Sequence, residues 1–424
     1  MKPPAQRRAS AFVALLVGAV LSISGCNSDT ASSTGGSKDL PDGVLTGPGV
    51  TDTTVTIGEL TDLTGVYATL GKSLTQAQQL YFDEVNAAGG ICGREIRLLV
   101  RDHGYDVAKG VAAYDEISPQ IIGISQLLGS PVVTAVLPSL DRDAVLAIPA
   151  AWPSTMLKQR YVQVVGATYD IEMINGVGFL LRERKVVAGD RVGHVYFEGE
   201  YGENALAGAR FAAQQAGLTL VEHRIKATDA DMAAQVAALK SQGVKAVLMS
   251  AGPKQSASLA GVAAAAGFNV PIVSSNPGFS PQLLTTPAKA ALEKNFFLVN
   301  SVQAPSSQVS GIQNLVQAYA AKFPGSPIDN GVAFGYVTAR VFGEALRKAC
   351  EAKDLTRQGV VAALHGMNAF DSDGVMAPLD FSNVGDTNTR ESYIQRPNAQ
   401  AQGGLETIDG PAPAEAALKY QVAP

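Results

Sequence analysis

The stretch Val55-Thr56-Ile57-Gly58-Glu59-Leu60 is short and rich in β-branched and apolar residues, which predicts a β-strand. A polar loop follows, and then a helical pattern whose apolar positions from Leu74 to Ala88 step by three or four residues. Residues 86–90, with the sequence NAAGG, supply a stop signal for that helix. A strand, a loop and a helix in this order form the repeating unit of a parallel sheet.

The same alternation continues along the chain and then starts again. The first series has strands at 96–101, 121–124 and 144–148 and helices at 107–117 and 132–140. After a helix at 171–184, the second series has strands at 191–196, 219–225, 246–250 and 270–274 and helices at 205–216, 232–242 and 256–266. Helices at 312–323 and 332–352 follow, and then a tail with strands near 378–381 and 392–396. We therefore expect an α/β fold of two similar units, each a parallel sheet with helices on both faces.

The composition is that of a large globular protein. The 424 residues are 46% hydrophobic and 17% charged, which excludes a disordered chain and a coiled coil and leaves room for two domains. The formal net charge of −5 argues against a nucleic-acid partner.

The N-terminus has the pattern of a targeting signal. Lys2, Arg7 and Arg8 precede an apolar run at 9–23, and small residues lead into Cys26. The segment resembles the lipobox of bacterial lipoproteins, in which the cysteine becomes the lipidated first residue. We expect a signal peptide at 1–25, a lipidated Cys26, a flexible tether at 26–49 and a location on the extracytoplasmic face of the cell membrane. A membrane anchor that is never cleaved is the alternative.

Cys92 and Cys350 remain once Cys26 is assigned to lipid. In an oxidising compartment an even pair favours a disulfide. Two buried free thiols are the alternative, because free cysteine behaves as a small apolar residue in protein cores.

The motifs of an enzyme are missing from the sequence. It has no P-loop, no Gly-x-Ser-x-Gly elbow and no complete dinucleotide fingerprint. The four histidines are isolated from one another and from cysteines, so we expect no metal site and no cofactor. We therefore expect a protein that is not an enzyme.

A ligand site is expected where the strands end. In parallel α/β sheets, ligands bind outside the carboxyl ends of the strands, and two units that face each other enclose one cleft. The loops expected to line it lie at 61–71, 125–130, 150–155, 169–170, 198–202, 251–254 and 276–279. Their short hydroxyls, glycines and few aromatics suit reversible binding of a small molecule.

Several of these segments carry a resemblance to a known family. The run IGELTDLTG at 57–65, the pair LG at 70–71 and the stretch NAAGGICGR at 86–94 resemble the opening of the leucine/isoleucine/valine-binding protein family. Segments at 102–109, 129–131 and 198–202 are similar to later parts of that family. Its members are type I periplasmic solute-binding proteins of ABC importers.

The resemblance implies two Rossmann-like lobes that are joined by a three-strand hinge and close on a ligand. The first lobe would comprise 50–168 plus 308–365, and the second 169–307 plus 366–424. The implied partners are a small-molecule ligand and the permease and ATPase subunits of an ABC importer, and the protein would be a monomer.

The resemblance also assigns roles at the ligand site. In the family's amino-acid binders, first-lobe hydroxyls hold the ligand carboxylate and second-lobe acids hold its ammonium. Ser130, Ser154 and Thr155 would take the first role, and Asp170 the second. Asp170 and Ser130 have helix N-caps as alternative roles. Trp152 and Tyr201 would stack on the ligand or belong to the core, and Tyr67, Gln126 and Asn276 complete the predicted ligand-binding residues.

One stretch departs from the family pattern. Amino-acid binders tend to carry a second acid in the segment that corresponds to 272–282, and here that segment has none. A desolvated ammonium needs a compensating charge, so an amide, a urea-like compound or an aromatic carboxylate competes with an α-amino acid as ligand. We expect a lipid-anchored solute-binding protein of an ABC importer; the alternatives are a ligand-sensing lipoprotein for a signalling partner and a hydrolase.

Overall fold

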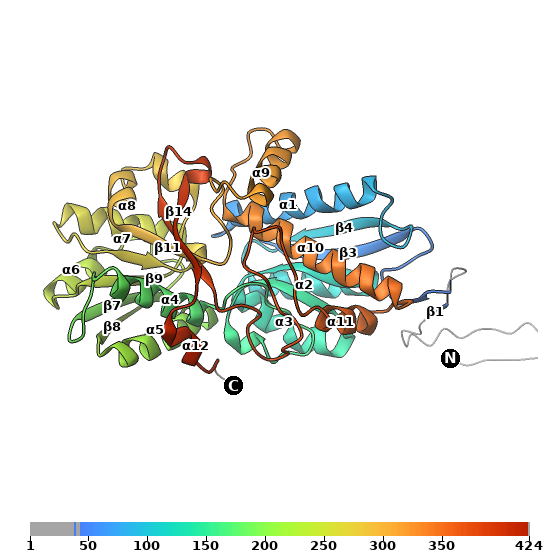
Figure 1. Ribbon diagram of the computed structural model, residues 1–424, viewed down its shortest axis with the longest axis horizontal. Helices are drawn as coiled ribbons and strands as arrows, with labels where there is room; N and C mark the ends of the chain where they lie inside the picture. The colour runs from blue at the N-terminus through green and yellow to red at the C-terminus, as the bar shows by residue number, and fades with distance from the viewer. Residues whose placement is uncertain (1–37, 40–42, 423–424) are drawn as a thin grey trace, which may run out of the picture. The chain divides into compact units, whose positions relative to one another are not determined.

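The computed structural model describes residues 38–39 and 43–422 (Figure 1). The predicted signal peptide, Cys26 and most of the predicted tether lie outside the described residues. Within the described part of the chain, no helix has both the length and the apolar character that crossing a lipid bilayer requires.

The first lobe is built on a four-stranded parallel sheet with the order β4-β3-β5-β6. Its strands are β3 (Thr54–Thr61), β4 (Glu95–Asp102), β5 (Gly123–Leu128) and β6 (Leu146–Ala150). Its helices are α1 (Ala68–Ala87), α2 (Val107–Ile117), α3 (Ser130–Asp143), α9 (Ser310–Lys322), α10 (Asn330–Glu351) and α11 (Arg357–His365). A small sheet of β1 (Lys38–Asp39), β2 (Leu45–Thr46) and β12 (Asp354–Leu355) completes the lobe.

The second lobe contains a seven-stranded sheet with the order β14-β13-β11-β10-β9-β7-β8. Its parallel strands are β7 (Arg191–Phe197), β8 (Thr219–Ile225), β9 (Ala246–Ser250), β10 (Ile272–Ser274) and β11 (Phe296–Asn300). The antiparallel strands β13 (Ser392–Pro397) and β14 (Leu405–Ala412) extend it. The helices are α4 (Tyr169–Arg182), α5 (Glu200–Ala216), α6 (Ala233–Ser241), α7 (Pro253–Ala265), α8 (Lys289–Asn295) and α12 (Glu415–Lys419).

Helices α1 and α10 hold the first lobe together although they are far apart in the sequence. They lie side by side in Figure 1, in blue and orange, and Arg347 Nη2 of α10 donates to Tyr81 Oη of α1 at 2.6 Å. The predicted stop signal of α1 is confirmed, because the helix ends at Ala87, within residues 86–90. Gly90 has a φ of 77°, and a Cβ there would lie 2.0 Å from Arg94 O, so the turn after the helix requires glycine. The structure joins Cys92, just after this stop, to Cys350 near the end of α10 in a disulfide with Cα atoms 6.1 Å apart.

Three segments, at 151–168, 301–309 and 366–391, carry the chain between the two sheets. They are hydrogen-bonded to one another. Ala167 N donates to Ser301 Oγ at 2.8 Å, and Gly166 N donates to Asn388 Oδ1 at 3.0 Å. Gln303 N donates to Val375 O at 2.9 Å. The predicted lobe boundaries at 168, 308 and 366 fall in or beside these segments.

The predicted order of strands and helices is confirmed, and most of the differences lie toward the C-terminus. The strand predicted near 378–381 is wrong, because this stretch makes only a single bridge between Phe370 and Leu379. The sequence pattern did not predict β1, β2, α8, β11, β12, α11, β14 or α12. β14 depends on antiparallel pairing with β13, which a local apolar pattern does not reveal.

Candidate ligand-binding site

A cavity of about 270 Å³ lies between residues of the two lobes, and we call it the inner cavity. The first lobe contributes the loop between β3 and α1, the start of α1 and the start of α10. The second lobe contributes the start of α7, the segment after β10, the end of β11 and the start of β14. The lining residues are Gly65, Val66, Tyr67, Ala68, Thr69, Leu70, Pro253, Lys254, Asn276, Pro277, Phe279, Ser280, Gln282, Leu283, Asn300, Asp329, Asn330, Gly331, Phe334 and Leu405.

Asp62 shapes the loop that brings Tyr67 to the cavity. Its buried carboxylate accepts hydrogen bonds from Thr64 N at 3.2 Å and from Tyr67 N at 2.8 Å. A Cβ at Gly71 would lie 1.9 Å from Asp62 O, so only glycine allows α1 to approach this loop. The local sequence therefore fixes where Tyr67 lies.

The start of α10 forms the opposite polar wall. Asp329 is the N-cap of this helix, and its side chain accepts from Gly331 N at 3.0 Å. Burial raises the pKa of Asp329 to about 7. Asn330 Nδ2 donates to Gln395 Oε1 of β13 at 2.7 Å.

Three residues that line the inner cavity each have a buried polar atom without a hydrogen-bond partner in the described part of the chain: Tyr67 Oη, Asn300 Nδ2 and Asn330 Oδ1. Asn300 Oδ1 accepts from Val302 N at 3.2 Å, which fixes the orientation of the amide and leaves its NH₂ group as the free donor. Burial raises the pKa of Tyr67 well above its usual range, so its hydroxyl stays protonated and is a second free donor. Buried donors without partners are costly, so both suit a ligand that brings acceptors.

The aromatic cluster of Tyr67, Tyr105, Trp152, Tyr169 and Tyr201 lies next to the inner cavity. The ring centroids are 5.1 Å apart for Tyr67 and Tyr105, and 4.3 Å apart for Tyr169 and Tyr201. Together with Ser130 and neighbouring apolar residues, the cluster leaves a space of only about 10 Å³, the size of one water. The small space and the inner cavity share Tyr67, Leu70 and Pro277, so the cluster borders one end of the inner cavity.

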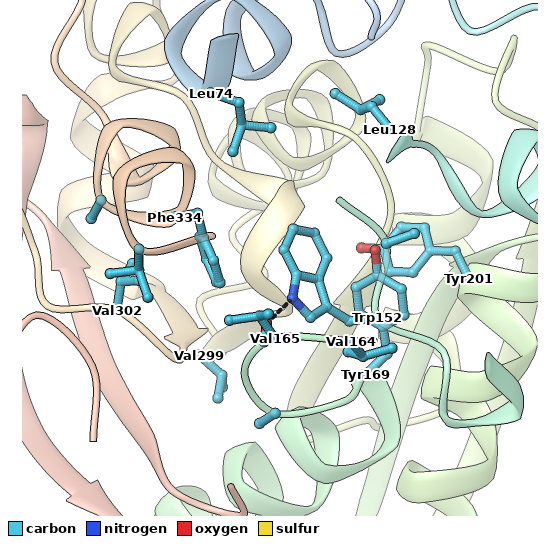
Figure 2. Close-up of a cluster of buried hydrophobic side chains, with 14 of the residues drawn as sticks. Leu74, Leu128, Trp152, Val164, Val165, Tyr169, Tyr201, Val299, Val302 and Phe334 are labelled. Carbon is cyan, nitrogen blue, oxygen red and sulfur yellow. Dashed lines mark hydrogen bonds between the residues drawn. The ribbon is translucent and has the colours of Figure 1, made fainter. Parts of the chain in front are cut away.

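Trp152 lies at the boundary between this cluster and the hydrophobic core (Figure 2). Its side chain is 2% exposed, and its Nε1 donates to Val165 O at 2.8 Å. Its ring centroid is 4.9 Å from that of Phe334, which lines the inner cavity. Trp152 is thus a core residue that supports the wall of the cavity.

Five of the predicted ligand-binding residues line one of these two spaces. Tyr67 and Asn276 line the inner cavity, whereas Ser130, Trp152 and Tyr201 border the small space in the aromatic cluster. The alternative role of Ser130 as an N-cap is wrong, because Gly129 is the N-cap of α3.

Ser154, Thr155 and Asp170 do not line either space. Ser154 Oγ donates to Asp170 Oδ2 at 2.6 Å, and Thr155 Oγ1 donates to Glu200. The N-cap alternative for Asp170 is also wrong, because α4 begins at Tyr169 with Thr168 as N-cap. Ser154 and Asp170 therefore satisfy each other inside the protein, whereas Thr155 is exposed and bonds Glu200 at the surface.

Gln126 is also absent from both linings. Its Nε2 donates to Thr61 Oγ1 at 2.5 Å in the interior of the first lobe. The sequence pattern placed it at a strand end but gave no sign of a partner on the neighbouring strand β3.

One acid behind the 272–282 segment could not be foreseen from the sequence. Glu172 of α4 is buried, and it accepts from Asn276 N at 3.1 Å and from Asn276 Nδ2 at 2.9 Å. Burial raises the pKa of Glu172 to about 8. A mostly protonated side chain at neutral pH does not provide the fixed negative charge that an ammonium group needs.

Nine cavity residues lie outside the predicted cleft loops: Ser280, Gln282, Leu283, Asn300, Asp329, Asn330, Gly331, Phe334 and Leu405. Residues 329–331 had a usable signal, because Asp-Asn-Gly directly precedes a strong helical pattern and is typical of a helix start. Residues 280–283 directly follow the predicted loop at 276–279, and Asn300, Phe334 and Leu405 reach the cavity through the packing of distant segments.

Comparisons with known proteins agree on one family. The family model described as periplasmic binding protein matches residues 54–403. Leu/Ile/Val-binding protein homolog 8 of Brucella abortus is 24% identical over 307 residues, which cover 69% of this chain and 76% of that protein.

Two solved structures extend the comparison. A fatty acid ABC transporter substrate-binding protein from Thermomonospora curvata is 48% identical, with a TM-score of 0.88 over 90% of this chain and 98% of that one. A branched chain amino acid ABC transporter from Thermus thermophilus with bound valine shares the fold, with 20% identity and a TM-score of 0.77 over 87% of this chain and 99% of that one. The chain belongs to the periplasmic binding protein family, as a type I solute-binding protein of ABC transporters rather than an enzyme.

Proposed function

We propose that this solute-binding protein captures a fatty acid, or a similar monocarboxylate with an apolar body, and delivers it to an ABC permease. The observation that carries the proposal is the pairing of an apolar lining with two free hydrogen-bond donors. Val66, Leu70, Leu283 and Phe334 offer apolar surface, and Tyr67 is one of the two donors.

A carboxylate would satisfy both free donors at once. Its two oxygens would accept from Tyr67 Oη and Asn300 Nδ2, the two cavity donors without a partner. Hydrogen bonds to a charged group are stronger than those between neutral groups. The rest of the ligand would then lie against apolar side chains, which supplies most of the binding energy.

The relative with 48% identity supports this ligand class, because it is a fatty acid ABC transporter substrate-binding protein. The charge of the cavity lining adds to the argument, because Asp329 is the one acid among the described residues that line the inner cavity. Burial raises the pKa of Asp329 to about 7 and that of Glu172, behind the lining, to about 8.

An amino acid or an amide is the second candidate ligand. Asn330 Oδ1 is a buried acceptor without a partner, and Asp329 lines the same cavity. Both would accept from ligand N–H groups, so a ligand screen has to include branched-chain amino acids, amides and aromatic carboxylates beside fatty acids.

The test is a thermal-shift screen followed by calorimetry. We expect fatty acids to raise the melting temperature, since a ligand present at 100 times its Kd adds about 2.7 kcal/mol of stability. Tyr67→Phe should weaken fatty-acid binding roughly 10- to 150-fold, because a hydrogen bond to a charged group contributes about 1.5–3 kcal/mol.

Tyr105→Phe is the matched control, because this tyrosine belongs to the aromatic cluster but does not line the inner cavity. Its affinity should stay within about twofold of the wild type. Binding of amino acids alone would favour the second candidate, and turnover of any bound compound would contradict a binding protein altogether.

We further propose that the protein is anchored to the membrane through lipid on Cys26 and works as a monomer on the extracytoplasmic face. Small residues before Cys26 and the polar stretch after it support this anchor. Cys26→Ala should release the protein from membranes, because the lipid would be its hydrophobic attachment. Fractionation of cells that express each form is the measurement, and a variant that still sediments with membranes would refute the anchor.

A further inference from the structure

We propose that a groove beside the inner cavity receives the far end of the acyl chain, so that the protein selects its ligands by chain length. This inference rests on the fatty-acid function proposed above. The groove has a volume of about 430 Å³ and lies between the turn that joins β13 to β14, the loop that joins α9 to α10, and the 3₁₀ helix η4 (Pro281–Thr285).

The groove and the inner cavity adjoin each other along three chain segments. In each segment, neighbouring residues line the two spaces: Leu284 borders the groove and Leu283 the cavity. Ile328 borders the groove and Asp329 the cavity. Gly404 borders the groove and Leu405 the cavity, so the two spaces meet at all three segments.

The chemistry of the groove suits an alkyl chain. None of its lining residues carries a charge, and Pro281, Leu284, Ile328 and Ala399 provide apolar surface. The turn residue Gly404 has a φ of 71°, and a Cβ there would lie 2.8 Å from Leu284 Cδ1. Glycine therefore lets the backbone of the turn lie directly on Leu284 without a side chain filling the groove.

The free donors determine which end of the ligand reaches the groove. Tyr67 borders both the inner cavity and the small space in the aromatic cluster, whereas the aromatic space and the groove have no lining residue in common. A carboxylate held by Tyr67 thus lies at the end of the cavity that the aromatic cluster borders. The chain then extends toward Leu283 and Leu405, the cavity residues directly beside the groove residues Leu284 and Gly404.

The two lobes together form this route. Ile328 precedes α10 of the first lobe, whereas Leu284 and Gly404 belong to the second. The turn also touches the first lobe, because a Cβ at Gly403 would lie 2.8 Å from Ile328 O. A hinge motion that parts the lobes would therefore open the inner cavity and the groove together, because each has walls from both lobes.

The experiment measures affinity for saturated fatty acids of 8 to 16 carbons by calorimetry. Each methylene removed from water contributes about fourfold in affinity, so wild-type affinity should keep rising with chain length. Ala399→Trp fills the groove and should weaken binding of the 16-carbon acid at least tenfold. The 8-carbon acid should bind within about twofold of the wild type.

Ala401→Trp is the matched control, because Ala401 lies on the same turn but does not line the groove. Gln402→Trp, at an exposed groove residue, is a second blocking variant in case Ala399→Trp melts at a lower temperature without ligand. If both blocking variants keep the wild-type dependence on chain length, the groove is not the chain site. If no fatty acid of any length binds the wild type, the proposed function itself fails.

Discussion

Replacing Trp152 with alanine should lower the free energy of unfolding by roughly 3–5 kcal/mol, the usual cost of removing a large aromatic side chain from a core. Trp152 is 2% exposed and packs against Phe334 and Tyr169, with ring centroids 4.9 and 5.9 Å away. The variant also loses the hydrogen bond from Nε1 to Val165 O. Urea denaturation of the protein without ligand is the measurement.

Trp152→Phe separates the contribution of aromatic packing from that of the hydrogen bond. It keeps an aromatic ring in the core but removes the N–H donor, so Val165 O loses its partner and the variant should lose less stability than Trp152→Ala. Ligand affinity should fall in Trp152→Ala as well, because Phe334 of the inner cavity rests on the indole. A loss of less than about 1 kcal/mol in Trp152→Ala would contradict the core position, and unchanged affinity would remove Trp152 from any role at the cavity.

Trp152 also illustrates what the sequence can predict about the site. Its place after a predicted strand correctly put it near the cleft, because the carboxyl ends of parallel strands meet at one edge of a sheet. The pattern left open whether it contacts ligand or belongs to the core. The structure shows why the two alternatives compete: the same ring packs in the core and supports a residue that lines the cavity.

The polar candidates have partners within the protein that the sequence did not reveal. Ser154, Thr155 and Asp170 were chosen as free side chains on cleft loops, but Ser154 bonds Asp170, and Thr155 bonds Glu200. A buried polar group such as Ser154 is nearly always paired, and its partner is 16 residues away. The partner of the exposed Thr155 is 45 residues away. Sequence spacing does not show which partner is reached.

The fold was more predictable than the site because strands and helices of the parallel sheets carry local signals. The buried strand β3 and the amphipathic helix α1 are read directly from 55–60 and from the spacing of apolar residues after Leu74. Strand β14 carries no such signal, since five of its eight residues are Gly, Pro, Ala, Asp or Glu and its pairing with β13 holds it in place. Leu405 reaches the cavity from this strand, so the site was missed together with the strand.

Glu59→Gln should remove much of the loss of stability that the protein suffers as pH rises. Glu59 lies on β3 and is fully buried. Burial raises the pKa of its carboxyl group to about 8, and the hydroxyl of Thr75 only partly opposes this rise. In the unfolded chain the group ionises near pH 4.5, the ordinary value for glutamate.

The direction of this pH dependence follows from how many protons the folded and unfolded states bind. Between about pH 4.5 and 8 the folded protein keeps a proton on Glu59 that the unfolded chain has lost. The folded state therefore binds more protons in this window, and stability falls as pH rises. A glutamine cannot ionise, so the variant does not lose this stability. From pH 5 to pH 8, the unfolding free energy of Glu59→Gln should therefore rise by roughly 3–4 kcal/mol relative to that of the wild type.

Other buried groups titrate as well, so the comparison has to be made between variant and wild type at each pH. Burial raises the pKa of Glu172 to about 8, so this group also lowers stability as pH rises. Burial lowers the pKa of His194 to about 3, so this group raises stability as pH rises toward 6.5. These contributions cancel in the difference. Glu95→Gln, at an exposed position on β4 of the same lobe, is the control and should leave the pH dependence unchanged. Urea denaturation from pH 5 to 8 is the measurement, and parallel curves for Glu59→Gln and the wild type would show that Glu59 does not hold a proton in the folded protein.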